Sequence, residues 1–182
     1  MTKEELVKKD NTFKESAFIA KVDNTYIMLL TAITTENLPR VKHKVSDELY
    51  QKLIEKLENL KQENAIKMYD ELNVKTSFIK NITEELDYYE ITVCLISRYL
   101  EYKIDKTTRK YKSGNNQSRV EKTHTLIFRK KKTAQTEGIS RKCPSCGAPV
   151  DTNNTGVCPY CHSTYNTKDY DWVLVSIDEN IL

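Results

Sequence analysis

The sequence predicts an α+β fold in which three helices near the N-terminus precede a four-stranded antiparallel sheet. Apolar residues recur at spacings of three and four up to about residue 63, as on one face of a helix. From residue 67, β-branched and aromatic residues alternate with polar ones, which is the period of a strand. Helices followed by consecutive strands are typical of α+β proteins, because a chain of βαβ units would alternate the two.

The helical part of the sequence divides into three segments. The first, residues 12–34, begins with Thr12-x-x-Glu15, a pattern typical of a capping box. A short helix is expected over residues 37–43, since a proline lies in its first turn. The third, residues 46–63, begins with a serine followed by two acids and carries leucines on one face. We expect these helices to cover one side of the sheet.

Four strands are predicted, at residues 74–82, 88–104, 120–132 and 170–177, with a polar hairpin loop at 105–119. On the first strand, one face is expected to hold Val74, Thr76, Phe78, Lys80 and Ile82. On the second, the apolar phase shifts near Leu95 and Ile96, which predicts a bulge or bend there. Aromatic side chains such as Phe78, Tyr89 and Tyr99 are expected to fill the space between the sheet and the helices.

The strongest motif is a pair of Cys-x-x-Cys knuckles, Cys143-Pro-Ser-Cys146 and Cys158-Pro-Tyr-Cys161. A two-residue gap lets one tight turn present two sulfurs to the same ion, and zinc favours four thiolates in a tetrahedron. The spacing predicts one structural Zn²⁺ ion, because four thiolates leave no coordination position for water. The alternatives are two disulfides, or His162 as a ligand in place of one cysteine.

The knuckles lie between the third and fourth predicted strands, in a connection that runs over residues 133–169. A connection of that length within a compact domain is expected to carry structure of its own. The sequence therefore predicts a single discontinuous domain, with residues 12–135 and 167–182 forming the body and residues 138–166 an inserted zinc ribbon.

Several runs of the sequence resemble one known family. They are Ser46–Tyr50, Tyr102–Asp105, Glu121–Arg129, the two knuckles and Tyr170–Leu174. Together they are similar to the bacterial, zinc-ribbon-bearing branch of the Tim44-like domain family, which is named for the import-motor subunit of the mitochondrial inner-membrane translocase. The resemblance covers about residues 12–177. It implies a cone-shaped, nuclear-transport-factor-two-like fold, in which helices fill the mouth of a strongly curved sheet.

The resemblance also implies a non-enzymatic scaffold, associated with a protein partner or a membrane surface and intracellular (cytoplasmic) or peripheral at the inner face of a membrane. No export signal and no apolar run of membrane-spanning length is visible in the sequence. Lysine and arginine far outnumber acids over residues 103–142. Within that segment, contact with an anionic surface is expected from Arg129, Lys130, Lys131 and Lys132. An apolar ligand is a further expectation for the cone cavity.

Two other classes of function remain open on the sequence alone. A nucleic-acid-binding protein would use the ribbon and the basic 103–142 segment. Against this, the ribbon interior from Ala148 to Val157 holds one acid and no base. A cavity enzyme on the same fold would use Asp70 or His124, but Asp70 precedes the sheet and His124 has no partner that the sequence reveals.

Overall fold

The computed structural model describes the chain except for residues 133–140, 144–145, 151–157, 163–170, 179–180 and 182. The helices are α1 (Lys3–Lys9), α2 (Glu15–Thr34), the 3₁₀ helix η1 (Leu38–Val41) and α3 (Asp47–Gln62). The strands of the main sheet are β1 (Ala65–Glu84), β2 (Tyr88–Asp105), β3 (Tyr111–Lys131) and β6 (Val173–Ser176). A second, two-stranded sheet is formed by β4 (Arg141–Lys142) and β5 (Pro149–Val150).

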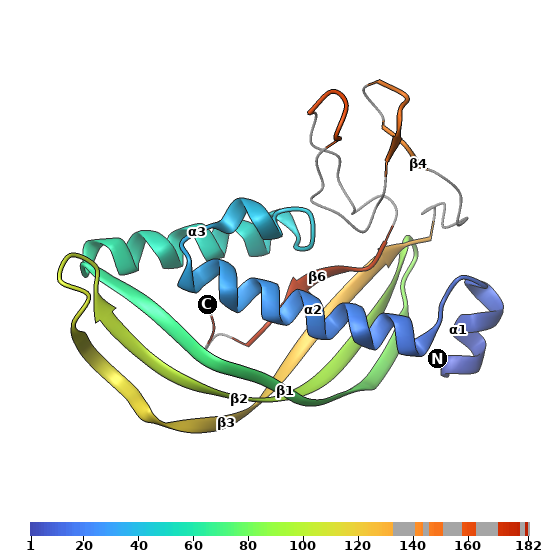
Figure 1. Cartoon of the computed structure of the whole chain (residues 1–182). Coiled ribbons are helices and arrows are strands. Elements are labelled where there is room, and N and C mark those ends of the chain that lie inside the picture. Colours follow the sequence, from blue (N-terminus) through green and yellow to red (C-terminus); the bar gives the residue numbers. More distant parts are fainter. Residues whose placement is uncertain (133–140, 144–145, 151–157, 163–170, 179–180, 182) are drawn as a thin grey trace.

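The main sheet has the strand order β1-β2-β3-β6, and all its neighbouring strands are antiparallel. Its three long strands curve strongly, and α2 and α3 lie over the concave side (Figure 1). The curvature accompanies breaks in the β1–β2 register at Asp70/Asn73, Val74/Thr76 and Ile79/Asn81, since a bulge bends a strand and increases its twist. The predicted cone-shaped α+β fold is therefore confirmed.

The ends of the helices differ from the prediction at the N-terminus. The sequence reasoning missed α1, whose capping box is formed by Thr2 and Glu5. The capping box predicted at Thr12 is wrong: α2 begins at Glu15 after Lys14, which makes no side-chain cap. The Thr12 hydroxyl instead donates to the carboxylate of Asp10, at 2.5 Å. A hydroxyl that finds a local carboxylate is no longer available to a helix amide.

The remaining helix boundaries agree with the sequence. Ser46 is the N-cap of α3, and its hydroxyl accepts a hydrogen bond from the Leu49 N–H at 3.1 Å. The short helix after residue 37 is present as η1, with a proline in its first turn. Between η1 and the start of α3, Lys44 and Ser46 form backbone hydrogen bonds with Leu174 of the last strand.

Two predictions about the strand faces are wrong. Ser97 is fully buried and continues the inward alternation of β2, so no phase shift occurs at Leu95 and Ile96. The breaks in the β2–β3 register lie further on, at Tyr99/Glu101 and Lys103/Ile104. Phe78 is 48% exposed, because the bulges of β1 turn it to the outer face, where it pairs with Cys94. Tyr89 and Tyr99 are buried, as expected.

The second hairpin is tighter than predicted. β3 begins at Tyr111, so most of the predicted 105–119 loop belongs to a strand. β6 is shorter than the predicted 170–177 strand. Asp171 and Trp172 precede it, and Tyr170 lies outside the described residues.

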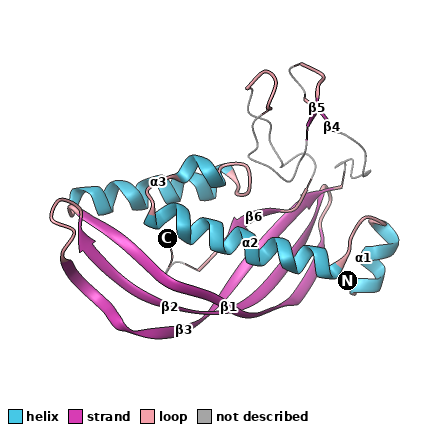
Figure 2. Cartoon of the chain, in the orientation of Figure 1, coloured by secondary structure: helices cyan, strands magenta, loops and turns pink. Residues whose placement is uncertain are grey.

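Figure 2 shows the two long helices facing the concave side of the sheet. The residues of the hydrophobic core come from these helices and from the strands opposite them. Its largest fully buried side chains include Tyr26 of α2, Tyr99 of β2 and Phe128 of β3. β6 closes the core from the other edge: the Leu174 N–H donates to the Lys44 carbonyl, and the Ser46 N–H donates to the Leu174 carbonyl, both at 2.9 Å. In the described part of the chain, no helix has the length and apolar character to cross a membrane.

Candidate functional site

The four predicted metal ligands converge at one point. The Sγ atoms of Cys143, Cys146, Cys158 and Cys161 all lie within 4.8 Å of one another. Cys143 and Cys161 are separated by 3.6 Å between sulfurs, and Cys146 and Cys158 by 3.7 Å. A disulfide bond is about 2.0 Å long, so these are free thiols and the two-disulfide alternative is wrong.

The two knuckles have the same local backbone. In the first, the Gly147 N–H donates to the Cys143 carbonyl at 2.8 Å, and in the second the His162 N–H donates to the Cys158 carbonyl at 2.9 Å. Gly147 has a φ of 73° and His162 a φ of 58°. The residue after the second thiol therefore turns into the left-handed region in both knuckles, which brings the two sulfurs of each turn to the same side.

The arrangement fits a tetrahedral metal ion. Sulfurs at the vertices of a tetrahedron, each about 2.3 Å from zinc, would be about 3.8 Å apart, close to the separations in the structure. The first thiol of each knuckle is buried and the second is exposed. His162 is exposed and does not join the converging ligand atoms in the described part of the chain. The group that the cluster suits is one metal ion held by four thiolates.

The electrostatics of the cluster also favour a cation. The Ala148 N–H lowers the pKa of Cys146, but the neighbouring thiols of Cys161, Cys143 and Cys158 and burial raise it, to about 12. Four sulfurs this close cannot all ionise by themselves, since like charges disfavour each other. A bound divalent cation supplies the charge that keeps such thiols deprotonated.

The predicted basic run Arg129–Lys132 is distributed over both sides of β3 and its end. Lys130 is buried and pairs with Asp10, so its assignment to an anionic surface is wrong. The Arg129 guanidinium lies 2.7 Å from the Glu90 carboxylate, and the Lys132 ammonium lies 3.0 Å from that of Glu84. Lys131 is exposed. Much of this positive charge is balanced within the protein.

The two residues considered for a cavity enzyme lie apart. Asp70 lies within β1, so the expectation that it precedes the sheet is wrong, and its carboxylate accepts a hydrogen bond from the Tyr102 hydroxyl on the outer side of the sheet. His124 is buried on the inner side and does have a partner: its Nδ1 lies 3.0 Å from the Asp178 carboxylate. Burial lowers the pKa of His124, although Asp178 opposes that effect. The pair ties the C-terminal segment to β3.

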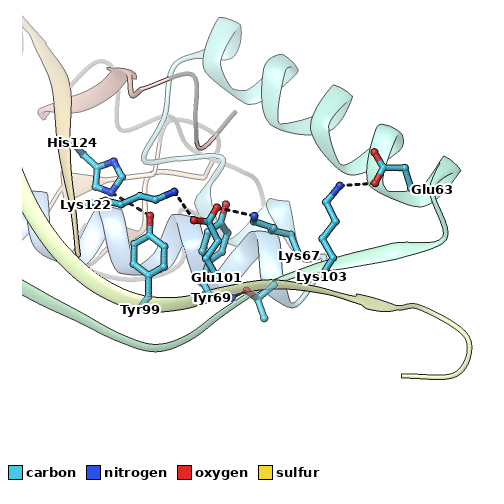
Figure 3. A network of polar contacts seen from close by, with 9 residues as sticks. Glu63, Lys67, Tyr69, Tyr99, Glu101, Lys103, Lys122 and His124 are labelled. Atoms are coloured by element: carbon cyan, nitrogen blue, oxygen red, sulfur yellow. Dashed lines mark hydrogen bonds and ion pairs between the residues drawn. The ribbon is translucent and has the colours of Figure 1, made fainter. Parts of the chain in front are cut away.

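A polar cluster that the sequence analysis missed is formed by side chains of β1, β2 and β3. Glu101 of β2 receives the ammonium groups of Lys67 and Lys122 from two sides, the first at 2.7 Å (Figure 3). Burial raises the pKa of Glu101, but the hydrogen bonds from the two lysines outweigh it and hold that pKa below its usual value. Nearby, the Tyr69 hydroxyl is buried without a hydrogen-bond partner in the described part of the chain.

Comparison with protein families identifies the body of the chain. The model of the Tim44-like domain matches residues 2–139, which span all three long strands and the helices above them. The chain belongs to the Tim44-like domain family. This result confirms the resemblance inferred from the sequence. The Tim44-like domain is in general a non-catalytic binding or scaffold domain, so membership supports a binding role and does not by itself name a partner.

Comparison with solved structures supports the same fold. The crystal structure of the intermembrane space region of the chloroplast protein ARC6 superimposes with a TM-score of 0.50 at 8% sequence identity. The match covers 91% of this chain and 95% of the chloroplast chain. At this identity the likeness concerns the fold alone. A comparison with curated protein sequences finds no significant match.

Proposed function

We propose that this Tim44-like protein is a non-enzymatic binding module for a protein partner, with one structural Zn²⁺ ion in its knuckles. The observation that carries the proposal is the four-cysteine cluster, whose geometry suits one metal ion. Between the two cysteines of the second knuckle, Tyr160 is 66% exposed. A large aromatic side chain on a turn fixed by metal loses little conformational entropy on binding, and tyrosine is enriched in protein interfaces.

The charge arrangement favours a protein over an anionic membrane as the partner. Of the four cations considered for membrane contact, Lys130 is buried, and Arg129 and Lys132 are paired with acids. A membrane-docking patch depends on cations close to the headgroups, each contributing about 1 kcal/mol. We expect co-sedimentation with liposomes that contain phosphatidylserine to show no dependence on the phosphatidylserine fraction at physiological salt, and a strong dependence would favour the membrane.

Metal analysis tests the zinc assignment. We expect purified, reduced protein to carry zinc at about one ion per chain, and the Cys143→Ser/Cys158→Ser variant to carry almost none. A wild-type zinc content near zero with reduced thiols would refute the metal centre.

Site-specific photo-crosslinking in the native cell tests the binding role. A photoreactive phenylalanine analogue at position 160 is expected to give a discrete protein adduct, which is lost when Cys143 and Cys158 are both serine. The control places the same group at Leu86, which is 89% exposed in the β1–β2 turn. Adducts of equal pattern at both positions, or none at position 160, would contradict a partner that binds the knuckle.

A further inference from the structure

A lysine-rich pocket lies between α3 and the paired ends of β1 and β2, apart from the cysteine cluster. Its volume is about 470 Å³. The lining residues are Lys52, Glu55, Lys56, Asn59, Leu60, Glu63, Lys67 and Lys103. Three elements thus bring their cations to one concave site, and lysines outnumber glutamates along its wall. Pockets of this size accommodate small organic ligands.

Two of the lysines already have acidic partners. The Lys67 ammonium lies 2.7 Å from the Glu101 carboxylate, and the Lys103 ammonium lies 2.5 Å from that of Glu63 at the end of α3 (Figure 3). Each ammonium group has three N–H donors. One carboxylate therefore leaves donors on both lysines for a further anion in the pocket.

Lys56 makes no hydrogen bond or ion pair within the part of the chain that the structure describes. It is half-buried on α3, between residues that line the same pocket. Burial lowers its pKa and the nearby charges of Lys67 and Lys103 lower it further, while Glu101 and Glu63 act in the opposite direction with a smaller effect. A half-buried cation next to other cations destabilises the ligand-free protein. A bound anion would offset this destabilisation.

We propose that this pocket binds a phosphomonoester group, held by Lys56, Lys67 and Lys103. Lysine acts on phosphate as a point charge, and three such charges from separate elements suit a dianion better than a flat carboxylate. A phosphomonoester group occurs both in small soluble phosphates and in the headgroup of phosphatidic acid. This site is independent of the metal centre, so the proposal goes beyond the function proposed above.

Titration of the metal-loaded full chain tests the proposal. Inorganic phosphate and glycerol 3-phosphate are added at matched ionic strength, and amide chemical shifts are followed by NMR. We expect saturable shifts around α3 and the adjoining ends of β1 and β2. Lys56→Gln should weaken binding about tenfold. It should also raise the thermal midpoint of the ligand-free protein by about 2 °C, because the unpaired cation is gone.

The matched control is Lys61→Gln, which removes an exposed lysine of the same helix that does not line the pocket. Its phosphate affinity should stay within about twofold of wild type. Equal losses of phosphate affinity in Lys56→Gln and Lys61→Gln would show that general surface charge explains the binding, and would overturn the proposal. The absence of saturable shifts with either phosphate, together with no binding to phosphatidic acid, would also overturn it.

A second arm distinguishes the sources. Phosphatidylcholine vesicles with and without phosphatidic acid are co-sedimented with the same proteins. Binding that requires phosphatidic acid and is lost in Lys56→Gln identifies a lipid headgroup, whereas saturable glycerol 3-phosphate shifts without vesicle binding identify a soluble ligand. The Cys143→Ser/Cys158→Ser variant should retain phosphate binding, so failure of this site and failure of the knuckle proposal are separable.

Discussion

The ammonium group of Lys130 lies in the interior, against the Asp10 carboxylate and within 3.2 Å of the Thr12 hydroxyl. Burial raises the pKa of Asp10, but hydrogen bonds from Lys130 and Thr12 outweigh it and lower that pKa overall. The contact joins the end of β3 to the turn between α1 and α2. A lysine in a basic run can therefore be a structural residue, and its neighbours in the sequence do not reveal this.

Lys130→Met is expected to lower the free energy of unfolding by about 3–5 kcal/mol, because it leaves the Asp10 carboxylate buried without its cation. Urea unfolding measures the change. Lys131→Met, at the exposed neighbouring position, is expected to stay within about 1 kcal/mol of wild type. A near-neutral Lys130→Met variant would contradict the structural role of the pair.

His43 is buried, and burial, with a smaller contribution from Lys44, lowers its pKa from 6.5 to about 4. The folded protein therefore favours neutral imidazole, and the unfolded chain takes up more protons between these values. Stability should fall as the pH decreases from 6.5 to 4, by up to about 3 kcal/mol. His43→Leu should reduce this slope, which denaturation across the pH range would measure. An unchanged slope would show that other groups are responsible.

At the scale of elements, Gly114 of β3 pairs with Tyr102 of β2 in a short regular stretch between the two breaks in the β2–β3 register. Gly114 has a φ of 100°, and a Cβ there would lie 2.6 Å from the Glu101 carbonyl oxygen and 2.6 Å from the Tyr102 Cα. Both obstacles are backbone atoms, which cannot move aside as a flexible side chain would. The turn of the strand at this point therefore requires glycine.

Gly114→Ala is expected to destabilise the protein by about 2–3 kcal/mol, from the contact with the β2 backbone and the left-handed φ together. Thermal unfolding measures the effect. Gly114→Asn is the control, because asparagine tolerates a positive φ but its Cβ meets the same two backbone atoms. We expect it to lose nearly as much stability as Gly114→Ala. Recovery of most of the stability in Gly114→Asn would show that φ alone matters.

The elements also show what the sequence could and could not predict. The α3 cap and each cysteine knuckle were predictable, because they depend on residues a few positions apart, and the preference of zinc for four thiolates predicted that the two knuckles meet. The side of the sheet on which Phe78 lies was not predictable, because three register shifts in β1 change the face to which its side chain points. Ser97 broke the apolar pattern of β2, yet it is buried, since its hydroxyl lies 2.7 Å from that of Tyr26. The lysine pocket combines α3, β1 and β2, whose relative placement no local pattern encodes.

At the scale of the whole molecule, the hydrophobic core and the metal cluster are separate. The core residues of the cone form one connected group, whereas Cys143 and Cys158 form another. We therefore expect the knuckles to depend on a bound metal ion for stability, since small zinc peptides bind their ion with an apparent free energy of about 10–16 kcal/mol. The cone depends on burial of its apolar side chains.

Removal of the metal by a chelator is expected to unfold the knuckles and leave the cone folded. Limited proteolysis should then cleave between Cys143 and Cys161 while the near-ultraviolet circular dichroism of Trp172 and its aromatic neighbours changes little. The thermal midpoint of the cone should shift only slightly in the Cys143→Ser/Cys158→Ser variant. Collapse of the whole chain on chelation would show that the two parts unfold together.

The position of β6 leads us to expect that the proposed metal ion speeds folding. This short strand follows the knuckles, yet it completes the sheet beside β3 and forms a parallel bridge with Val45 through Leu174. Its pairing must close a long loop, and the entropy lost on closure grows with the length of free chain. A metal ion that joins the two knuckles shortens that free chain in advance, so the loaded protein should dock its last strand faster than the metal-free one.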